Sequence, residues 1–245
     1  MKDEPGSSRV DLSIDRRSVL AILGGAATVG LLRLVQGGNL AYALTSEEHA
    51  KITPDEIIAQ AKKGNERFLS GKRKERDLLR EQKNTAKDQY PEAIVLSCID
   101  SRAPVELILD LGIGDTFNSR VAGNIANEDI LGSMEYACAV AGSKPVLVMG
   151  HTACGARKGA VDQVQLGNLT GLLEKIRQAI EATQYDGDRT TKNSLFVNAI
   201  ARKNVELTMA GIRARSPVLK KLEDQGHIKI AGAMYSVETG VVEFI

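Results

Sequence analysis

The sequence has few of the residues that would hold a small disulfide-rich domain together or attract nucleic acid. It contains three cysteines in 245 residues, too few for a disulfide framework. Lysine and arginine number 32 against 31 aspartates and glutamates, and this balance gives no support to nucleic-acid binding. Tryptophan is absent, and no repeat or low-complexity stretch is present. The scarce cysteines and the three histidines are therefore the residues to place first.

The amino-terminal segment has the pattern of an export signal. Arg16 and Arg17 precede an apolar run from Val19 to Leu32, and Ala41-Tyr-Ala offers small residues around a cleavage point. The run of 14 residues is shorter than the roughly twenty that span a bilayer. An uncleaved anchoring helix is the alternative interpretation.

We therefore predict a twin-arginine-type signal peptide over residues 1–43 and a periplasmic or otherwise exported protein. Contact with a membrane is then limited to the export signal. The remaining residues, 44–245, form one domain, with a helical arm at about 53–90 and an α/β core at about 91–245.

The core alternates between short apolar runs and helical patterns. Ala93-Ile-Val-Leu-Ser and Pro145-Val-Leu-Val-Met-Gly are typical of parallel strands that are buried on both faces. Thr53-Pro-Asp-Glu is a capping box that starts a helix ended by Gly71. Further helices are expected at 73–87, 105–109, 130–141, 166–183, 195–213 and 217–225, another strand at 115–121, and a final hairpin at 228–237 and 241–245. The pattern predicts an α/β fold with a mostly parallel central sheet.

Three possible metal ligands follow the two apolar strands. Cys98 comes directly after the first, and His151 and Cys154 follow the second in Gly150-His-Thr-Ala-Cys-Gly. The carboxyl ends of neighbouring parallel strands form one edge, where α/β proteins bind ligands. Two thiolates and one imidazole make three ligands, and a catalytic zinc site keeps its fourth position open. The alternative, two ordinary buried thiols and a turn histidine, suits a single residue better than three at two strand ends.

Asp100 and Arg102 continue from Cys98 at spacing Cys-x-Asp-x-Arg. Alternate residues of an extended segment point the same way, so all three side chains can face one pocket. An arginine fork can hold a carboxylate ionised and fixed in orientation. Alternatively, the two residues form only a salt bridge at the start of the helix that begins after Pro104.

These motifs resemble those of the β-class carbonic anhydrases. The resemblance extends from about Lys51 to the carboxyl terminus and includes Arg120-Val-Ala-Gly-Asn-Ile-Ala-Asn, Gly132-Ser-Met-Glu-Tyr-Ala, Gly167-Asn-Leu-Thr-Gly-Leu-Leu and Ser216-Pro-Val-Leu through Gly232-Ala-Met-Tyr. It implies four parallel strands flanked by helices, to which the carboxyl-terminal edge strand or hairpin is added. It also implies one Zn²⁺ per subunit, carbon dioxide and bicarbonate as substrates, and a homodimer or dimer of dimers.

The resemblance assigns roles to individual residues. Cys98, His151 and Cys154 match the zinc ligands, and Asp100 and Arg102 match a catalytic dyad. Substrate-binding positions are expected at Gln89, Phe117, Tyr136 and Gly155, of which the first three come from the partner subunit in one subclass. Val140 stands where plant members often carry a proton-exporting histidine, so that role is not transferred.

The resemblance also indicates the subclass. Bicarbonate-inhibited members carry tryptophan three residues before the first ligand cysteine, and here that residue is Val95. With Gln89 present, we predict the open, non-inhibited type. In members that close the site the residue matching Asp100 becomes a fourth zinc ligand, so Asp100 is kept as a conditional metal contact.

The expected function is reversible hydration of carbon dioxide by a hydroxide on zinc, oriented by the Asp100–Arg102 dyad. Cys154 precedes a helix start, where the helix dipole favours the ionised sulfur. Two alternatives remain: a zinc hydrolase of a related electrophile such as carbon disulfide, and a zinc-binding scaffold without turnover. His49 and His227 are not placed near the ligands by any spacing and are expected at the surface.

Overall fold

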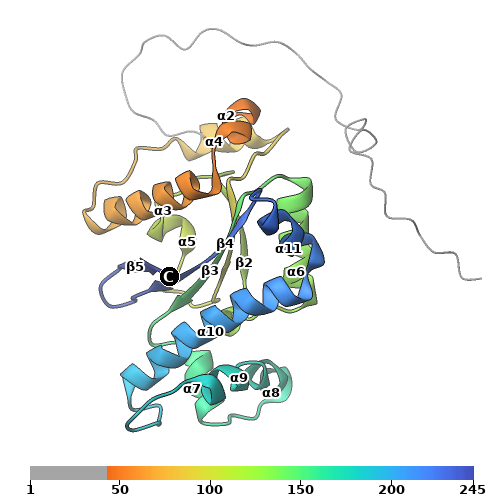
Figure 1. The fold of residues 1–245 in the computed structure, drawn as a ribbon. Coiled ribbons are helices and arrows are strands. Elements are labelled where there is room, and N and C mark those ends of the chain that lie inside the picture. The colour runs from red at the N-terminus through yellow and green to blue at the C-terminus, as the bar shows by residue number, and fades with distance from the viewer. Residues whose placement is uncertain (1–42) are drawn as a thin grey trace, which may run out of the picture. The chain divides into compact units, whose positions relative to one another are not determined.

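The computed structural model describes residues 43–245 (Figure 1). The predicted signal peptide falls on residues that lie, except for Ala43, outside this part of the chain, so the export signal stays a prediction. No helix in residues 43–245 is long and apolar enough to cross a membrane.

One sheet of five strands forms the centre of the described chain (Figure 1). Its order is β2-β1-β3-β4-β5, with the first four parallel and β5 antiparallel to β4. The strands are β1 (Ala93–Ser97), β2 (Thr116–Arg120), β3 (Pro145–His151), β4 (Lys229–Tyr235) and β5 (Val242–Phe244). The predicted fold class, four parallel strands with a carboxyl-terminal edge strand, is confirmed.

Helices surround the sheet (Figure 1). In chain order they are α2 (Ser46–Lys51), α3 (Pro54–Leu69), α4 (Leu78–Thr85), α5 (Val105–Ile108), the 3₁₀ turn η2 (Ala122–Asn124), α6 (Glu128–Glu135), the π-helical turn η3 (Tyr136–Val140), α7 (Gly155–Val161), α8 (Gly167–Glu174), α9 (Arg177–Ala182), α10 (Ser194–Arg215) and α11 (Pro217–Asp224).

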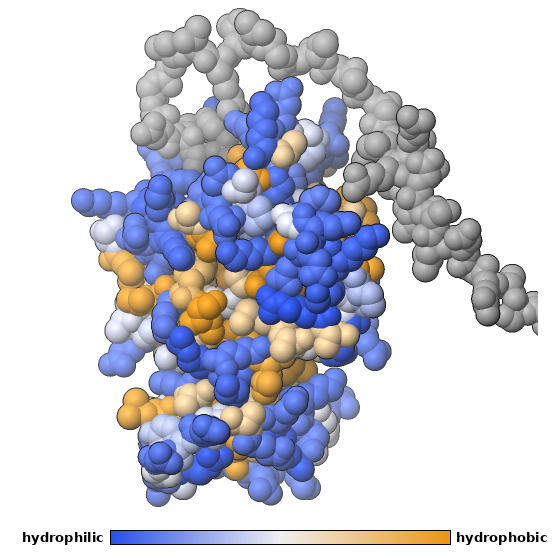
Figure 2. Space-filling model, in the orientation of Figure 1, coloured by the Kyte–Doolittle hydropathy of each residue, from blue (hydrophilic) through white to orange (hydrophobic). Residues whose placement is uncertain are grey.

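Alternate residues of the buried strands pack on opposite faces of the sheet. Ile94 and Leu96 of β1 join a core with residues of α6, η3, α10 and α11. Val95 of β1 and Leu147 of β3 join a second core with residues of α5 and the carboxyl-terminal hairpin, against which α3 packs. A third apolar cluster lies among α7, α8, α9 and α10. On the face shown in Figure 2, apolar residues gather between α3 and α10, and the rest is largely hydrophilic.

Three helices differ clearly from the sequence prediction, and one further helix was not expected. The helix expected at 73–87 forms only at 78–85. Before it, Arg73 forms an ion pair with Asp110, and Arg76 forms ion pairs with Glu81 and Asp115. The helix expected at 166–183 is interrupted by hydrogen bonds of the tighter i→i+3 type around Ile176. The helix expected at 130–141 starts at 128 and ends as the π-helical turn η3. Helix α2 was not expected, although Thr45 and Glu48 form a capping box at its start.

Candidate metal centre

The three possible ligands meet at the carboxyl edge of the sheet. Cys98 follows β1, His151 ends β3, and Cys154 caps the amino end of α7. Strands β1 and β3 are hydrogen-bonded neighbours whose chain connections leave in opposite directions, which is the switch point where α/β sheets bind ligands. One ligand atom from each residue lies within 4.8 Å of the others, and all three residues are buried.

The imidazole of His151 has one nitrogen available for a metal. Its Nδ1 lies 2.8 Å from the carbonyl oxygen of Thr152. Because a carbonyl only accepts, Nδ1 carries the proton and Nε2 presents a lone pair. Nε2 is buried and has no hydrogen-bond partner. A buried nitrogen without a partner is costly in an ordinary core but suits a metal ligand held by its other nitrogen.

The two sulfurs have the chemistry of a shared cation site. Cys98 and Cys154 are free rather than disulfide-bonded. Their mutual hydrogen bond, with burial, raises the pKa of Cys98, and the same hydrogen bond lowers the pKa of Cys154 against burial. The two sulfurs therefore share one proton, and a divalent cation can replace this proton between them. Two sulfurs, one imidazole and one free lone pair fit a three-ligand Zn²⁺ site.

The turn between the ligands is held in an uncommon conformation. Ala153 has φ of 54°, in the left-handed region that residues with a Cβ rarely adopt. Its N–H donates to Asn198 Oδ1 at 3.0 Å, and its carbonyl accepts from Arg102 Nη2 at 3.3 Å. This turn lies between His151 and Cys154, whose ligand atoms lie within 4.8 Å of each other.

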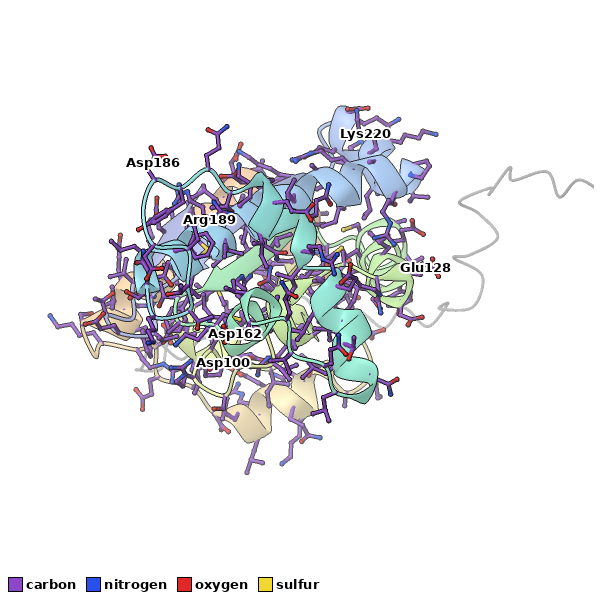
Figure 3. The ribbon with its side chains drawn as sticks, turned by 90° about the horizontal axis from the view of Figure 1, so that it is seen from below. Asp100, Glu128, Asp162, Asp186, Arg189 and Lys220 are labelled. Carbon is purple, nitrogen blue, oxygen red and sulfur yellow. The ribbon has the colours of Figure 1, made fainter. Side chains whose placement is uncertain are left out.

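Asp100 and Arg102 form a pair beside the cluster. Arg102 Nε lies 2.9 Å from Asp100 Oδ1, and Nη2 lies 2.8 Å from Oδ2. These hydrogen bonds lower the pKa of Asp100 to about 2. Asp100 Oδ2 also lies 3.8 Å from His151 Nε2. In Figure 3 Asp100 lies inside the outline of the molecule, whereas Glu128 and Lys220 lie at its periphery. Pro104, not Asp100, precedes α5, and no side chain caps the start of that helix.

Arg120 is a site residue to which the sequence analysis gave no role. Its Nε donates to the Cys98 carbonyl at 2.9 Å, and its Nη2 donates to the Asp100 carbonyl at 2.6 Å. It thereby fixes the backbone that carries both residues. The sequence indicated only a strand at 115–121, and the register that pairs Arg120 with Ser97 of β1 comes from the fold.

The expected substrate-binding residues do not all meet the cluster within one chain. Gly155 directly follows Cys154, and a Cβ there would meet no atom within 4 Å. Gln89 is exposed in the loop before β1, at the amino edge of the sheet. Phe117 pairs with Ile94 near the amino end of β1, and its ring lies 6.1 Å from that of Tyr136. Gln89 and Phe117 thus lie toward the opposite end of the strands from Cys98.

The expectation for one histidine was wrong. His49 is 7% exposed, and its Nε2 donates to the Pro91 carbonyl at 3.1 Å. Burial lowers the pKa of this imidazole, so the neutral form that makes the hydrogen bond is favoured. The ring anchors α2 at the amino edge of the sheet. His227 is exposed, as expected.

Comparisons with known proteins agree in sequence and in fold. A family model described as carbonic anhydrase matches residues 93–242. Carbonic anhydrase 2 of Mycobacterium tuberculosis is 31% identical over 185 residues, which cover 73% of this chain and 86% of the relative. A carbonic anhydrase of Pseudomonas aeruginosa is 30% identical over 168 residues, covering 66% of this chain and 76% of the relative.

Solved structures show the same architecture. A β-carbonic anhydrase of Coccomyxa, solved with acetazolamide, superposes with a TM-score of 0.60 at 21% identity, covering 78% of this chain and 82% of that one. One of two tetrameric β-carbonic anhydrases of Sordaria macrospora gives a TM-score of 0.58 at 22% identity, covering 78% and 92%. At these identities the likeness concerns the fold.

Proposed function

Because the chain belongs to the carbonic anhydrase family and has the fold of the β class, we propose that it catalyses the reversible hydration of carbon dioxide to bicarbonate and a proton. The observation that carries this proposal is the convergence of two cysteines and one histidine within 4.8 Å at the switch point of the sheet. A cofactor of one Zn²⁺ per subunit follows from this ligand set, held by Cys98, His151 and Cys154.

When bound, zinc would supply a hydroxide nucleophile near neutral pH by lowering the pKa of water. The protein's part begins with orientation. The Thr152 carbonyl holds the His151 ring so that Nε2 faces the two sulfurs. Arg120 and the Ala153 turn fix the two backbone segments that carry the ligands. These contacts hold the ligand residues so that their donor atoms lie close to one another.

Asp100 positions the nucleophile. Arg102 holds the pKa of this carboxyl at about 2, so near neutral pH Asp100 accepts hydrogen bonds and does not carry the released proton. A carboxylate fixed by two guanidinium contacts can accept the nucleophile's hydrogen bond and direct its lone pair at carbon dioxide. If the pair with Arg102 breaks, Asp100 is also close enough to His151 to become a fourth ligand.

A partner subunit would complete the substrate pocket. Gln89 and Phe117 lie toward the far end of the strands from Cys98, so one chain does not bring them to the cluster. We propose that these two residues and Tyr136 reach the site of a neighbouring copy in a homodimer or dimer of dimers. Tyr136 is 52% exposed, which leaves it available for such a contact. A monomeric mass for the active protein in solution would exclude this arrangement.

The decisive experiment compares Asp100→Ala and Asp100→Asn with the wild type. We expect both variants to keep one zinc per chain while carbon dioxide hydration falls about a hundredfold, the scale of losing one positioned group. Metal analysis and stopped-flow hydration measure the two quantities. Unchanged hydration would remove Asp100 from the mechanism. A zinc-loaded wild type without turnover would indicate a scaffold, and competition by carbon disulfide would indicate the related hydrolase.

We also propose export by a twin-arginine route. The support is the Arg16-Arg17 pair before the apolar run, and the chemistry of the site agrees with it. A route that carries folded proteins would protect ligand thiols from oxidation, whereas unfolded cysteines in an oxidising compartment would be exposed to it. Cell fractionation of the full chain and of a variant with both arginines changed to lysine tests the proposal, and equal export of the two would contradict it.

A further inference from the structure

Arg157, in the first turns of α7, is a fully buried cation. Its side chain is 0% exposed. Nη2 donates to Asn124 Oδ1 at 2.6 Å, whereas Nε and Nη1 are buried without a partner. In residues 43–245 no carboxylate forms an ion pair with it. A guanidinium with one polar partner in the interior carries a desolvation cost that its visible contacts do not offset.

Packing alone does not explain a charge at this position. Three residues of α7, Ala156, Ala160 and Val161, pack against the apolar cluster formed with α8, α9 and α10. Buried ionic groups can often be replaced by apolar side chains of similar volume with no loss of stability. A side chain that only filled space here would be better apolar.

Contacts along α7 and through the η2 turn relate Arg157 to the two ligand cysteines. Cys154 lies one helical turn before Arg157, at the amino end of the same helix. The pKa of its thiol is lowered mainly by the hydrogen bond with Cys98, and the positive charge of Arg157 makes a smaller contribution in the same direction. Asn124, which accepts from Arg157, is preceded by Gly123, whose N–H donates to Cys98 Sγ at 3.4 Å. The Gly123 carbonyl is in turn held by Asn204 Nδ2 at 3.0 Å. Arg157 therefore acts on the Cys154 sulfur electrostatically and is linked to the Cys98 sulfur through Asn124 and Gly123 of the η2 turn.

We propose that Arg157 is a positioning residue that supplies the buried positive charge opposite the two ligand sulfurs, and that Asn124 orients it. The proposal rests on the proposed zinc site. Two thiolates in a buried pocket repel each other, and a nearby fixed cation lowers the cost of bringing them together. The result is tighter metal binding, with no contact between Arg157 and the metal.

The test uses two variants that remove the field in different ways. Arg157→Met removes the charge. Asn124→Asp leaves the guanidinium in place and pairs it with a carboxylate of the same shape as the amide. Asn124 has φ of 41°, which aspartate tolerates, and its Nδ2 has no partner to lose. Arg157→Lys, which keeps a charge, is the conservative control.

The readouts are zinc affinity, by competition with a chromophoric chelator, and the absorption spectrum of the cobalt-substituted protein. We expect Arg157→Met and Asn124→Asp to weaken zinc binding about tenfold or more, as changes to groups behind metal ligands do. Arg157→Lys should recover part of the loss. The thermal midpoint of metal-free Asn124→Asp should not fall, because its new carboxylate pairs with Arg157.

Wild-type zinc affinity in Asn124→Asp would overturn the proposal even if Arg157→Met failed to fold. Weaker binding in both variants, with an intact fold in Asn124→Asp, would support it. The proposed function is judged separately, by carbon dioxide hydration of the wild type. A zinc-loaded wild type without hydration would refute that function and leave the comparison of affinities valid.

Discussion

The two ends of the central sheet differ in whether their buried polar atoms have hydrogen-bond partners. At the carboxyl edge the unpartnered buried atoms include Ser97 Oγ and His151 Nε2. At the amino edge Asp110 accepts from Arg67, Arg73 and the Lys74 N–H. Buried polar groups without partners are rare in native proteins and often have a functional reason. The comparison therefore separates an edge kept open for chemistry from an edge that is closed by hydrogen bonds.

The amino edge is closed because it anchors the helical arm. Arg76 reaches from the segment before α4 and bonds Glu81 at 2.8 Å and Asp115 at 3.0 Å. Glu81 is 1% exposed and also accepts from the Ile113 N–H. Arg76 Nε is the one atom of this group without a partner among those described. The ion pairs of Arg76 thus join the helical arm to the sheet and are buried. At the other edge, the ion pair between Arg102 and Asp100 is half exposed beside the proposed site.

The largest expected effect lies at the closed edge. Arg76→Met leaves Glu81 and Asp115 as buried carboxylates without their cation, a change that costs about 3 to 5 kcal/mol of unfolding free energy. Zinc content should not change, since the site lies at the other end of the strands. Urea unfolding and metal analysis test this.

Arg73→Met is the matched control for that prediction. Arg73 is 38% exposed, and Asp110 keeps Arg67 when it is removed. We expect this variant to lose at most about 1 kcal/mol, the scale of a surface pair. Equal losses of unfolding free energy in Arg76→Met and Arg73→Met would show that the buried ion pairs stabilise the fold no more than a surface pair.

A half-buried carboxylate is the exception at the closed edge. No hydrogen bond to the side chain of Glu92 is present in the described residues, and it lines a cavity of about 50 Å³ with Arg76, Lys74 and Asp115. Burial, with a smaller contribution from the Asp115 charge, raises its pKa to about 7 against the pull of Lys74 and Arg76. The folded chain then binds this proton more tightly than the unfolded chain, so stability falls as pH rises from about 4.5 to 7.

Glu92→Gln should remove the loss of stability that accompanies ionisation of this carboxyl. At pH 8 the variant is expected to be more stable than the wild type by about 1 to 3 kcal/mol, and at pH 4 the two should be nearly equal. Glu75→Gln, an exposed position on the arm, is the control and should show no pH-dependent difference. Urea unfolding at both pH values measures the effect. A difference that is the same at both pH values would rule out ionisation as its cause.

The sequence predicted the open edge better than the closed one. Cys98 and His151 follow apolar strands that can be recognised without a structure, so their meeting at one edge could be foreseen. The ion pairs of Arg76 could not, because they join residues distant in sequence and no local pattern links them. The same limit explains why residues 73–77 were expected to be helical: their charges suit an exposed helix, and tertiary contacts decide otherwise.

Long-range contacts also account for the site residues that were missed. Arg120 acts through the register of β2 on β1, and Arg157 through the η2 turn, which the sequence shows only as a stretch rich in small residues. His49 lies in α2, and its buried ring donates to the carbonyl of Pro91, which lies 42 residues later in the sequence. Sequence patterns indicated the candidate ligands, and the fold was needed to identify the contacts that hold them.

The smallest expected effect compares two buried serines, one at each edge. Ser97, 1% exposed at the end of β1, has an unpartnered hydroxyl, whereas the hydroxyl of Ser143, 0% exposed before β3, donates to the Pro91 carbonyl at 2.8 Å. Ser143→Ala should cost about 1 kcal/mol, the net value of one hydrogen bond. Ser97→Ala removes a hydroxyl that gains nothing from burial, so stability should stay within about 0.5 kcal/mol or rise. If urea unfolding showed equal losses, Ser97 would have a partner in solution, and the carboxyl edge would be closed like the other.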